Sequence, residues 1–192
     1  MDLKNKNKAF FLDRDGTINK YIPYIDKIED FEIMDGVSKA IKMINDSGWL
    51  TIVVTNQPQV ARGQLTEIDI IAMHDKMEKL LEKDNAKIDG IYYCPHSPAG
   101  SFNEGNKEYQ INCLCRKPKN GLYLQAQKDF KINFENSIFI GDTTRDIAAT
   151  NDIGGKSILL KCGLGGKDKK YLVKPDHYCD DLLHAVELML KN

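Results

Sequence analysis

The sequence predicts an α/β fold built on a doubly wound, mostly parallel sheet, and two observations lead to this prediction. Short apolar runs of strand length recur along the 192 residues, and amphipathic patterns of helix length lie between them. The strand-sized runs are apolar throughout, as expected for strands whose two faces are both covered by helices. We therefore expect a single domain, spanning residues 1–192, in which strands and helices alternate.

Four apolar runs are the predicted strands. They are bounded by polar or turn-forming residues, and β-branched and aromatic side chains are frequent in them. Runs this short cannot cross a bilayer, so we expect no membrane-spanning segment. The predicted strands are Ala9–Leu12, Leu50–Thr55, Ser137–Gly141 and Ser157–Leu160.

Apolar residues at helical spacing predict five helices between and after these strands. Thr66 precedes one of them and is a candidate N-cap, and Gly48 follows another and is a candidate C-cap. The predicted helices are Gly36–Ser47, Thr66–Leu81, Gly121–Phe130, Arg145–Asn151 and Asp180–Leu190.

Composition argues against a nucleic-acid partner and against export. Hydrophobic residues make up 42% of the chain and charged residues 29%, and the formal net charge is -1. Lysine and arginine are spread along the sequence, and the densest basic run, Lys167–Lys174, is typical of a solvated loop. No apolar run as long as the h-region of a signal peptide follows the polar stretch Met1–Lys8, so we expect no secretory signal and a cytoplasmic location.

Polar side chains follow three of the predicted strands. A pair of aspartates two residues apart is common in surface loops, but here the pattern of apolar strand followed by acid occurs twice. Because the carboxyl ends of parallel strands meet at one edge of a sheet, these side chains are expected to lie close together. They are Asp13 and Asp15, Thr55 and Asn56, and Asp142 with Asp146.

Four motifs in this order resemble those of the haloacid dehalogenase superfamily of phosphohydrolases. They are DRDGT at 13–17, the strand that ends in Thr55, a lysine at 117 and GDTTRD at 141–146. The resemblance implies a Rossmann-like core and a Mg²⁺-dependent reaction through an aspartyl-phosphate.

The resemblance also implies a role for each acid. Asp13 would attack phosphorus and hold Mg²⁺. Asp15 would offer its backbone carbonyl to Mg²⁺, while its side chain acts as general acid and then as general base. Asp142 would be a metal ligand, and Asp146 a further ligand or a holder of water. Taken alone, Asp146 could instead be an acid favoured at a helix start.

The remaining motif residues would bind the phosphoryl group. By the same resemblance, Thr55 and the backbone amide of Asn56 would contact phosphoryl oxygens, and Lys117 would pair with the nucleophile and the phosphate. Taken alone, Thr55 could be a structural hydroxyl at a strand end and Lys117 a surface lysine.

A cluster of soft ligands lies in the stretch Pro95–Lys119 and just before it. Cys94, His96, Cys113 and Cys115 form two short pairs, and three thiolates with one imidazole match a closed, structural zinc site. The intervening residues include few apolar side chains, so a metal would order them where a core cannot. The alternatives are a coincidental pair of short motifs that bind no metal, or a disulfide such as Cys94–Cys113.

The same cluster narrows the resemblance to a zinc-containing branch of the superfamily. CPHSP at 94–98 and CLCRKP at 113–118 are similar to this branch, whose members act on D-glycero-D-manno-heptose 1,7-bisphosphate or on histidinol phosphate. TNQPQVARG at 55–63 and RKPKNG at 116–121 are similar to the heptose enzymes. Members of this branch have no large cap domain, so loops would form the substrate site: 18–31, 57–63 and 97–112.

The length of the loop between the two pairs favours a heptose substrate. Sixteen residues separate His96 from Cys113, and the histidinol-phosphate enzymes have a much shorter loop there. Arg62 and Arg116 are candidates to bind a second phosphate, because a guanidinium fork matches phosphate oxygens. The resemblance thus implies a monomeric enzyme of nucleotide-activated heptose biosynthesis that removes the C7 phosphate.

Three alternatives stay open at this point. The substrate could be histidinol phosphate or another small phosphorylated metabolite. A phosphoacceptor switch domain of the receiver type also places aspartates, Mg²⁺, a threonine and a lysine on a doubly wound sheet, but it needs no acid–base residue such as Asp15. A zinc-stabilised nucleic-acid module lacks its basic stripe here.

Overall fold

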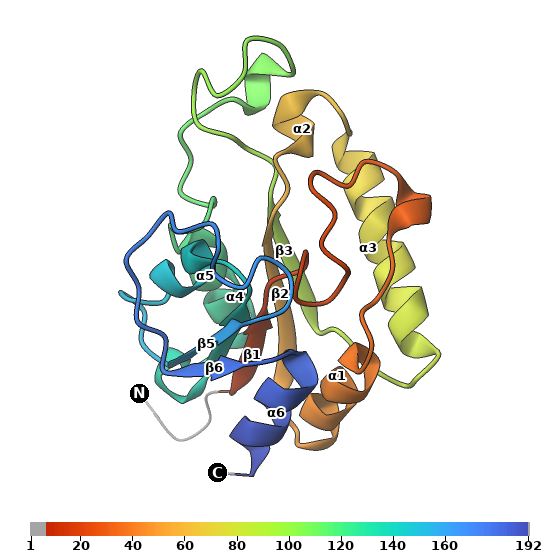
Figure 1. Ribbon diagram of the computed structural model, residues 1–192, viewed down its shortest axis with the longest axis vertical. Helices are drawn as coiled ribbons and strands as arrows, with labels where there is room; N and C mark the ends of the chain where they lie inside the picture. Colours follow the sequence, from red (N-terminus) through yellow and green to blue (C-terminus); the bar gives the residue numbers. More distant parts are fainter. Residues whose placement is uncertain (1–6, 192) are drawn as a thin grey trace.

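Six strands form a parallel sheet at the centre of the computed structural model, which describes residues 7–191 (Figure 1). The strand order is β3-β2-β1-β4-β5-β6, and all neighbouring pairs are parallel. Most of the polar stretch at 1–8, where no export signal is predicted, lies outside the described residues. The strands are β1 (Ala9–Leu12), β2 (Leu50–Asn56), β3 (Gly90–Cys94), β4 (Ile138–Gly141), β5 (Lys156–Leu160) and β6 (His177–Cys179).

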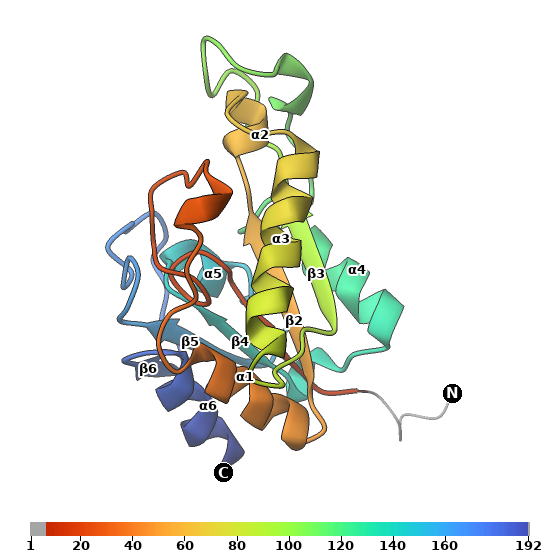
Figure 2. The ribbon, with the colours of Figure 1, turned by 90° about the vertical axis from the view of Figure 1, so that its right-hand side faces the viewer.

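Helices cover both faces of this sheet (Figure 2). The α-helices are α1 (Val37–Asp46), α2 (Gln59–Arg62), α3 (Glu67–Glu82), α4 (Gly121–Phe130), α5 (Thr144–Ala148) and α6 (Leu182–Leu190), and the short 3-10 helices are η1 (Ile28–Asp30), η2 (Lys107–Tyr109) and η3 (Phe134–Asn136). Phe10 and Leu12 of β1 lie in a core with α1, α3 and α6, whereas Ala9 and Phe11 lie in a second core with α4. Because successive side chains of a strand point to opposite faces of the sheet, β1 contributes residues to both cores.

The prediction of a doubly wound α/β sheet is confirmed, and all four predicted strands are present. Two further strands, β3 and β6, were not predicted from the sequence and form the two edges of the sheet. Most of β3 is only partly buried, and β6 has only three residues. An edge strand has one neighbour, and its sequence carries a weaker signal.

The predicted helices are also present, with small differences at their ends. Thr66 caps α3 as predicted: its hydroxyl accepts from the Asp69 amide at 3.2 Å, and the Asp69 carboxylate accepts from the Thr66 amide at 2.7 Å. Helix α5 ends at Ala148 rather than at Asn151, because turns follow it and lead to Gly154.

The order of the strands creates a crevice between β1 and β4. The chain winds outward from β1 through β2 to β3, returns to β4 beside β1, and continues outward to β6. Loops that leave β1 and β4 therefore diverge, and their carboxyl ends open a space for a ligand. Asp13 follows β1 and Asp142 follows β4, so the two acidic motifs meet at this point.

The segment 94–115, here called the Cys/His loop, projects beyond the sheet beside α2 (Figures 1 and 2). The Asn106 amide donates to the Ala61 carbonyl at 3.1 Å. A Cβ on Gly105 would lie 2.6 Å from the same carbonyl oxygen, so this close approach needs glycine. No helix within residues 7–191 has the length and apolarity required to cross a bilayer.

Candidate active site

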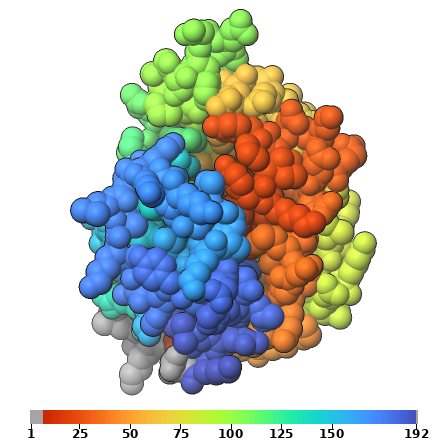
Figure 3. Space-filling model, viewed as in Figure 1, coloured from red at the N-terminus to blue at the C-terminus, as the bar shows by residue number. Residues whose placement is uncertain are grey.

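A cleft of about 840 Å³ opens at the carboxyl ends of the strands. On the front surface, the loop after β1 (orange-red) faces the segment after β5 (blue), below the green Cys/His loop (Figure 3). Asp142 is fully buried. The other predicted motif and phosphate-binding residues line the cleft: Asp13, Asp15, Thr55, Asn56, Arg62, Arg116, Lys117 and Asp146.

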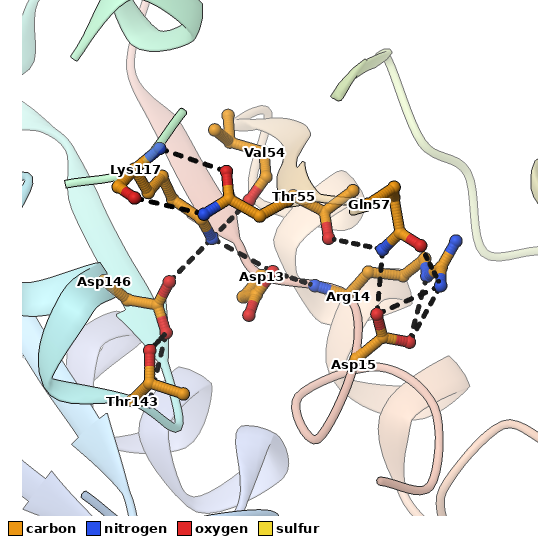
Figure 4. A network of polar contacts seen from close by, with 10 residues as sticks. Asp13, Arg14, Asp15, Val54, Thr55, Gln57, Lys117, Thr143 and Asp146 are labelled. Carbon is orange, nitrogen blue, oxygen red and sulfur yellow. Dashed lines mark hydrogen bonds and ion pairs between the residues drawn. The ribbon is translucent and has the colours of Figure 1, made fainter. Parts of the chain in front are cut away.

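The ammonium group of Lys117 lies among three oxygen acceptors (Figure 4). Its Nζ is 3.0 Å from Asp13 Oδ1, 2.6 Å from Asp146 Oδ1 and 2.7 Å from the Val54 carbonyl oxygen. Only 2% of the lysine is exposed. Lys117 is thus a buried cation that holds two carboxylates side by side, not a surface lysine.

Burial and neighbouring charges have opposite effects on the pKa values of Asp13 and Lys117. Burial raises the pKa of Asp13 to about 6, although the Lys117 charge lowers it. Burial also disfavours the charged form of Lys117, but Asp13 and Asp146 outweigh it and raise the pKa of the lysine. At neutral pH the lysine is charged, and Asp13 is mainly the carboxylate that a nucleophile requires.

One carboxylate oxygen of Asp142 lacks a hydrogen-bond partner among the described residues. Asp142 Oδ2 accepts from the Leu164 amide at 2.6 Å, whereas the buried Oδ1 makes no hydrogen bond within residues 7–191. Burial raises the pKa of Asp142 to about 8. Carboxylate oxygens of Asp13, Asp142 and Asp146 lie within 4.8 Å of one another. A buried unsatisfied oxygen beside two further carboxylates fits a hard divalent cation such as Mg²⁺.

Asp146 has two roles in the structure. Its Oδ2 accepts from the Thr143 amide at 3.0 Å and from the Thr143 hydroxyl at 2.6 Å, which caps α5. Its other oxygen contacts Lys117. Asp146 is therefore both an acid at the start of a helix and one of the three clustered carboxylates.

Gly16 lets the first motif approach Asp142 closely. Its φ of +83° lies in the left-handed region, and a Cβ there would collide with the Asp142 carboxylate. Only glycine meets both conditions without strain.

Asp15 is held by side chains that the sequence analysis does not single out. Arg14 Nη2 donates to both carboxylate oxygens, at 2.9 and 3.0 Å. Gln57 Nε2 donates to Oδ2 at 2.8 Å and Asn19 Nδ2 to Oδ1 at 3.0 Å. Burial favours the neutral acid, but the Arg14 charge and these hydrogen bonds outweigh it and lower the pKa of Asp15. Arg14 stands between two recognised acids, whereas no local pattern indicates Gln57 or Asn19.

Thr55 and Asn56 reach the site from the end of β2. The Thr55 hydroxyl accepts from Gln57 Nε2 at 3.0 Å. The Asn56 side chain forms a pair of hydrogen bonds with the Lys117 backbone, at 3.0 and 3.1 Å. Asn56 thereby links Lys117 to β2. The contacts of Thr55 and of the Asn56 amide with a phosphoryl group stay predictions.

Three arginines line the cleft. The Arg62 guanidinium lies between two rings, 3.6 Å from the centre of Tyr24 and 4.4 Å from that of Phe102. Arg116 Nη1 donates to the His96 carbonyl at 2.8 Å. Burial, and then the nearby charge of Arg145, lower the pKa of Arg116. Arg145 also lines the cleft, although it was not predicted as a site residue from the sequence.

The four predicted zinc ligands converge. Cys94 Sγ lies 3.7 Å from His96 Nδ1, 3.6 Å from Cys113 Sγ and 3.0 Å from Cys115 Sγ. Ligand atoms around tetrahedral zinc, with bonds of about 2.0–2.3 Å, stand about 3.3–3.8 Å apart. The cysteines are free thiols, so no disulfide joins Cys94 to Cys113. The donor set fits zinc; two of the three separations fall in this range, and the one between Cys94 and Cys115 is shorter.

Comparison with known proteins agrees with this geometry. A family model described as HAD-hydrolase-like matches residues 114–185. D-glycero-beta-D-manno-heptose-1,7-bisphosphate 7-phosphatase of Haemophilus ducreyi is 43% identical over 158 residues, which are 81% of this chain and 84% of that protein. D-glycero-alpha-D-manno-heptose-1,7-bisphosphate 7-phosphatase of Campylobacter jejuni is 43% identical over 151 residues, or 78% of this chain and 80% of that protein.

A solved structure extends the similarity to nearly the whole chain. D,D-heptose 1,7-bisphosphate phosphatase from B. bronchiseptica, complexed with magnesium and phosphate, has a TM-score of 0.83 and 27% identity. The match covers 96% of this chain and 98% of that one. With its acidic cluster at the switch point, the chain belongs to the HAD-like hydrolases. Within them it belongs to the family of heptose-1,7-bisphosphate 7-phosphatases represented by these relatives.

Proposed function

We propose that this chain hydrolyses the C7 phosphate of D-glycero-D-manno-heptose 1,7-bisphosphate. The names of its relatives support the substrate, and the group of Asp13, Lys117, Asp146 and Asp142 supports the reaction. Relatives are named for both the alpha and the beta substrate, so the proposal covers either anomer.

Asp13 is the proposed nucleophile. One of its carboxylate oxygens attacks phosphorus, the bond from phosphorus to the C7 oxygen breaks, and an aspartyl-phosphate forms. Lys117, at 3.0 Å from Asp13, neutralises charge on the nucleophile and on the phosphoryl oxygens. Thr55 and the Asn56 amide are proposed as further donors to those oxygens, since both residues line the cleft beside Lys117.

Asp15 is the proposed acid and base. In its protonated form it gives a proton to the departing C7 oxygen. The resulting carboxylate then takes a proton from the water that attacks phosphorus, which releases inorganic phosphate and restores Asp13. Its position in the cleft, close to Asp13 in sequence and fixed by three donors, supports this role.

Two metals complete the proposal. Mg²⁺, with Asp13, Asp142 and Asp146 as side-chain ligands and the Asp15 carbonyl as a further ligand, would neutralise charge on the phosphoryl group. Zinc, held by Cys94, His96, Cys113 and Cys115, would fix the Cys/His loop and would have no open position for a substrate.

The remote end of the substrate would meet the outer loops. A C7 phosphate on an exocyclic arm can reach the strand ends while the ring and the C1 phosphate stay among the loops. Arg116 and Arg62 are the proposed donors to that second phosphate, since both line the cleft. Residues of one chain supply every group named here, so the reaction needs only a monomer.

A phosphate-release assay tests the proposal. Heptose 1,7-bisphosphate, heptose 7-phosphate and histidinol phosphate are compared with Mg²⁺ in excess, and Asp13→Asn serves as the control. We expect the highest kcat/KM for the bisphosphate and no turnover by the variant. A higher kcat/KM for histidinol phosphate would overturn the substrate, and turnover by Asp13→Asn would overturn the mechanism.

A further inference from the structure

Arg14 lies between the two acids of the first motif and contacts both of them. Its backbone amide donates to Asp13 Oδ1 at 2.8 Å, and its side chain binds both oxygens of Asp15. The residue is 0% exposed, so its guanidinium has no water to replace a lost partner. One residue therefore fixes the nucleophile through its backbone and the acid–base carboxylate through its side chain.

The guanidinium fork is itself held on a second side. Arg14 Nε also donates to Asp15 Oδ1 at 3.2 Å, and Nη2 donates to Gln57 Oε1 at 2.8 Å. Since Gln57 Nε2 returns to Asp15 Oδ2 at 2.8 Å, the three side chains close a ring of hydrogen bonds (Figure 4). Rotation of the Asp15 carboxylate would break contacts to both neighbours at once.

His74 of α3 fixes the remaining arm of the fork. Its Nε2 lies 3.3 Å from Arg14 Nη1. A guanidinium can only donate, so this nitrogen must carry the lone pair and the ring must be neutral. His74 is 5% exposed and packs edge-on against Tyr93, with ring centres 5.5 Å apart. The imidazole is thus a fixed acceptor that α3 supplies to Arg14.

We propose that Arg14, Gln57 and His74 form a positioning set that orients the Asp15 carboxylate for proton transfer. Gln57 acts directly on Asp15, whereas His74 acts through Arg14. This role rests on the proposed phosphatase activity. The set affects the two proton transfers made by Asp15, whereas Lys117 serves the binding of the phosphoryl group. Loss of the set slows the step in which Asp15 must take a proton from water.

An aryl phosphate separates this role from a general loss of structure. The leaving group of 4-nitrophenyl phosphate departs as a stable phenolate, so formation of the aspartyl-phosphate needs little help from an acid. Hydrolysis of that intermediate still needs the base. A misplaced Asp15 therefore predicts a rapid burst of nitrophenolate, equal to the enzyme concentration, followed by slow turnover.

The test uses two variants with Mg²⁺ in excess, followed by stopped-flow absorbance. Gln57→Met removes the three side-chain hydrogen bonds of the glutamine, to Asp15, Arg14 and Thr55. His74→Leu removes the acceptor for Arg14 and leaves Thr55 untouched. We expect steady-state turnover to fall about 10- to 100-fold, as for a catalytic group displaced by a fraction of an ångström to one ångström. The burst rate should be retained, and His74→Gln, which restores an acceptor, should recover part of the turnover.

Gln59→Met is the matched control. Gln59 is also buried and donates to the Ile25 carbonyl at 3.3 Å, without contacting Asp15 or Arg14. It should change the burst and the steady state by the same factor. If Gln57→Met and His74→Leu also lower both rates equally, or lower neither, the positioning role is wrong. Failure of the wild type to release phosphate, or turnover by Asp13→Asn, would instead refute the proposed function.

Discussion

His74 should make the folded chain sensitive to acid, and the size of the effect follows from its surroundings. Burial, and then the Arg14 charge, lower the pKa of His74 from 6.5 to about 3. Between these values the unfolded chain binds a proton that the folded chain does not, so stability rises with pH and is lost as pH falls below 6.5. At pH 5 this single group lowers the free energy of unfolding by about 2 kcal/mol.

His74→Gln isolates this contribution. Glutamine does not titrate but keeps an acceptor for Arg14, so the variant should lose about 2 kcal/mol less than the wild type between pH 7 and pH 5. Burial raises the pKa of Asp13 and Asp142, which acts in the opposite direction, but both proteins share those groups and the difference removes them.

Urea unfolding is the suitable assay, because the single tryptophan, Trp49, packs against Phe10 in the core at 5.0 Å between ring centres. Curves are measured at pH 7 and pH 5 for both proteins in the same buffer and at the same metal concentration. Equal losses of stability in the two proteins would show that His74 is protonated in the folded chain, and the assigned tautomer would then be wrong.

The other predictions concern the site itself. Asp13→Asn should keep the fold and lose turnover, whereas Asp15→Asn should accumulate a phospho-enzyme visible by intact mass; a few per cent of residual activity in Asp13→Asn would contradict the mechanism. Lys117→Met leaves buried carboxylates without their cation and should cost about 3–5 kcal/mol in urea unfolding without Mg²⁺, and a smaller loss with it; an unchanged midpoint would be inconsistent with the buried pair. Elemental analysis should find about one zinc per chain, and Cys113→Ser should lose it and reduce turnover even with Mg²⁺ in excess; a zinc-free protein with a Cys94–Cys113 disulfide would overturn that site. Arg116→Ala should shrink the kcat/KM difference between the heptose bisphosphate and its 7-phosphate; an equal loss on both would remove Arg116 from the second phosphate.

The interior of the fold could be predicted because burial on both faces leaves a local signature. β1, β2, β4 and β5 are apolar runs with neighbours on both sides, and the amphipathic helices alternate with them. The edge strand β3 has partly exposed side chains, and the three residues of β6 are too few to show a pattern. The two strands that could not be predicted, β3 and β6, are therefore those with a single neighbouring strand.

The candidate site divides in the same way. Asp13 and Asp142 could be placed because each directly follows a strand, and the strand order brings those ends together. Lys117 was found through the resemblance alone, since its position depends on Asn56, which holds its backbone from 61 residues away.

Arg14 shows where local reasoning stops. Between two aspartates it has the character of a spacer, and a charged residue in a turn is normally solvated. A guanidinium that is 0% exposed needs acceptors on every side, and here they come from Asp15, from Gln57 after β2 and from His74 on α3. Only the packing of β2 and α3 against the first loop brings these partners within reach. The motif thus indicates Asp13 as the attacking acid, whereas residues distant in the sequence determine how Asp15 is held.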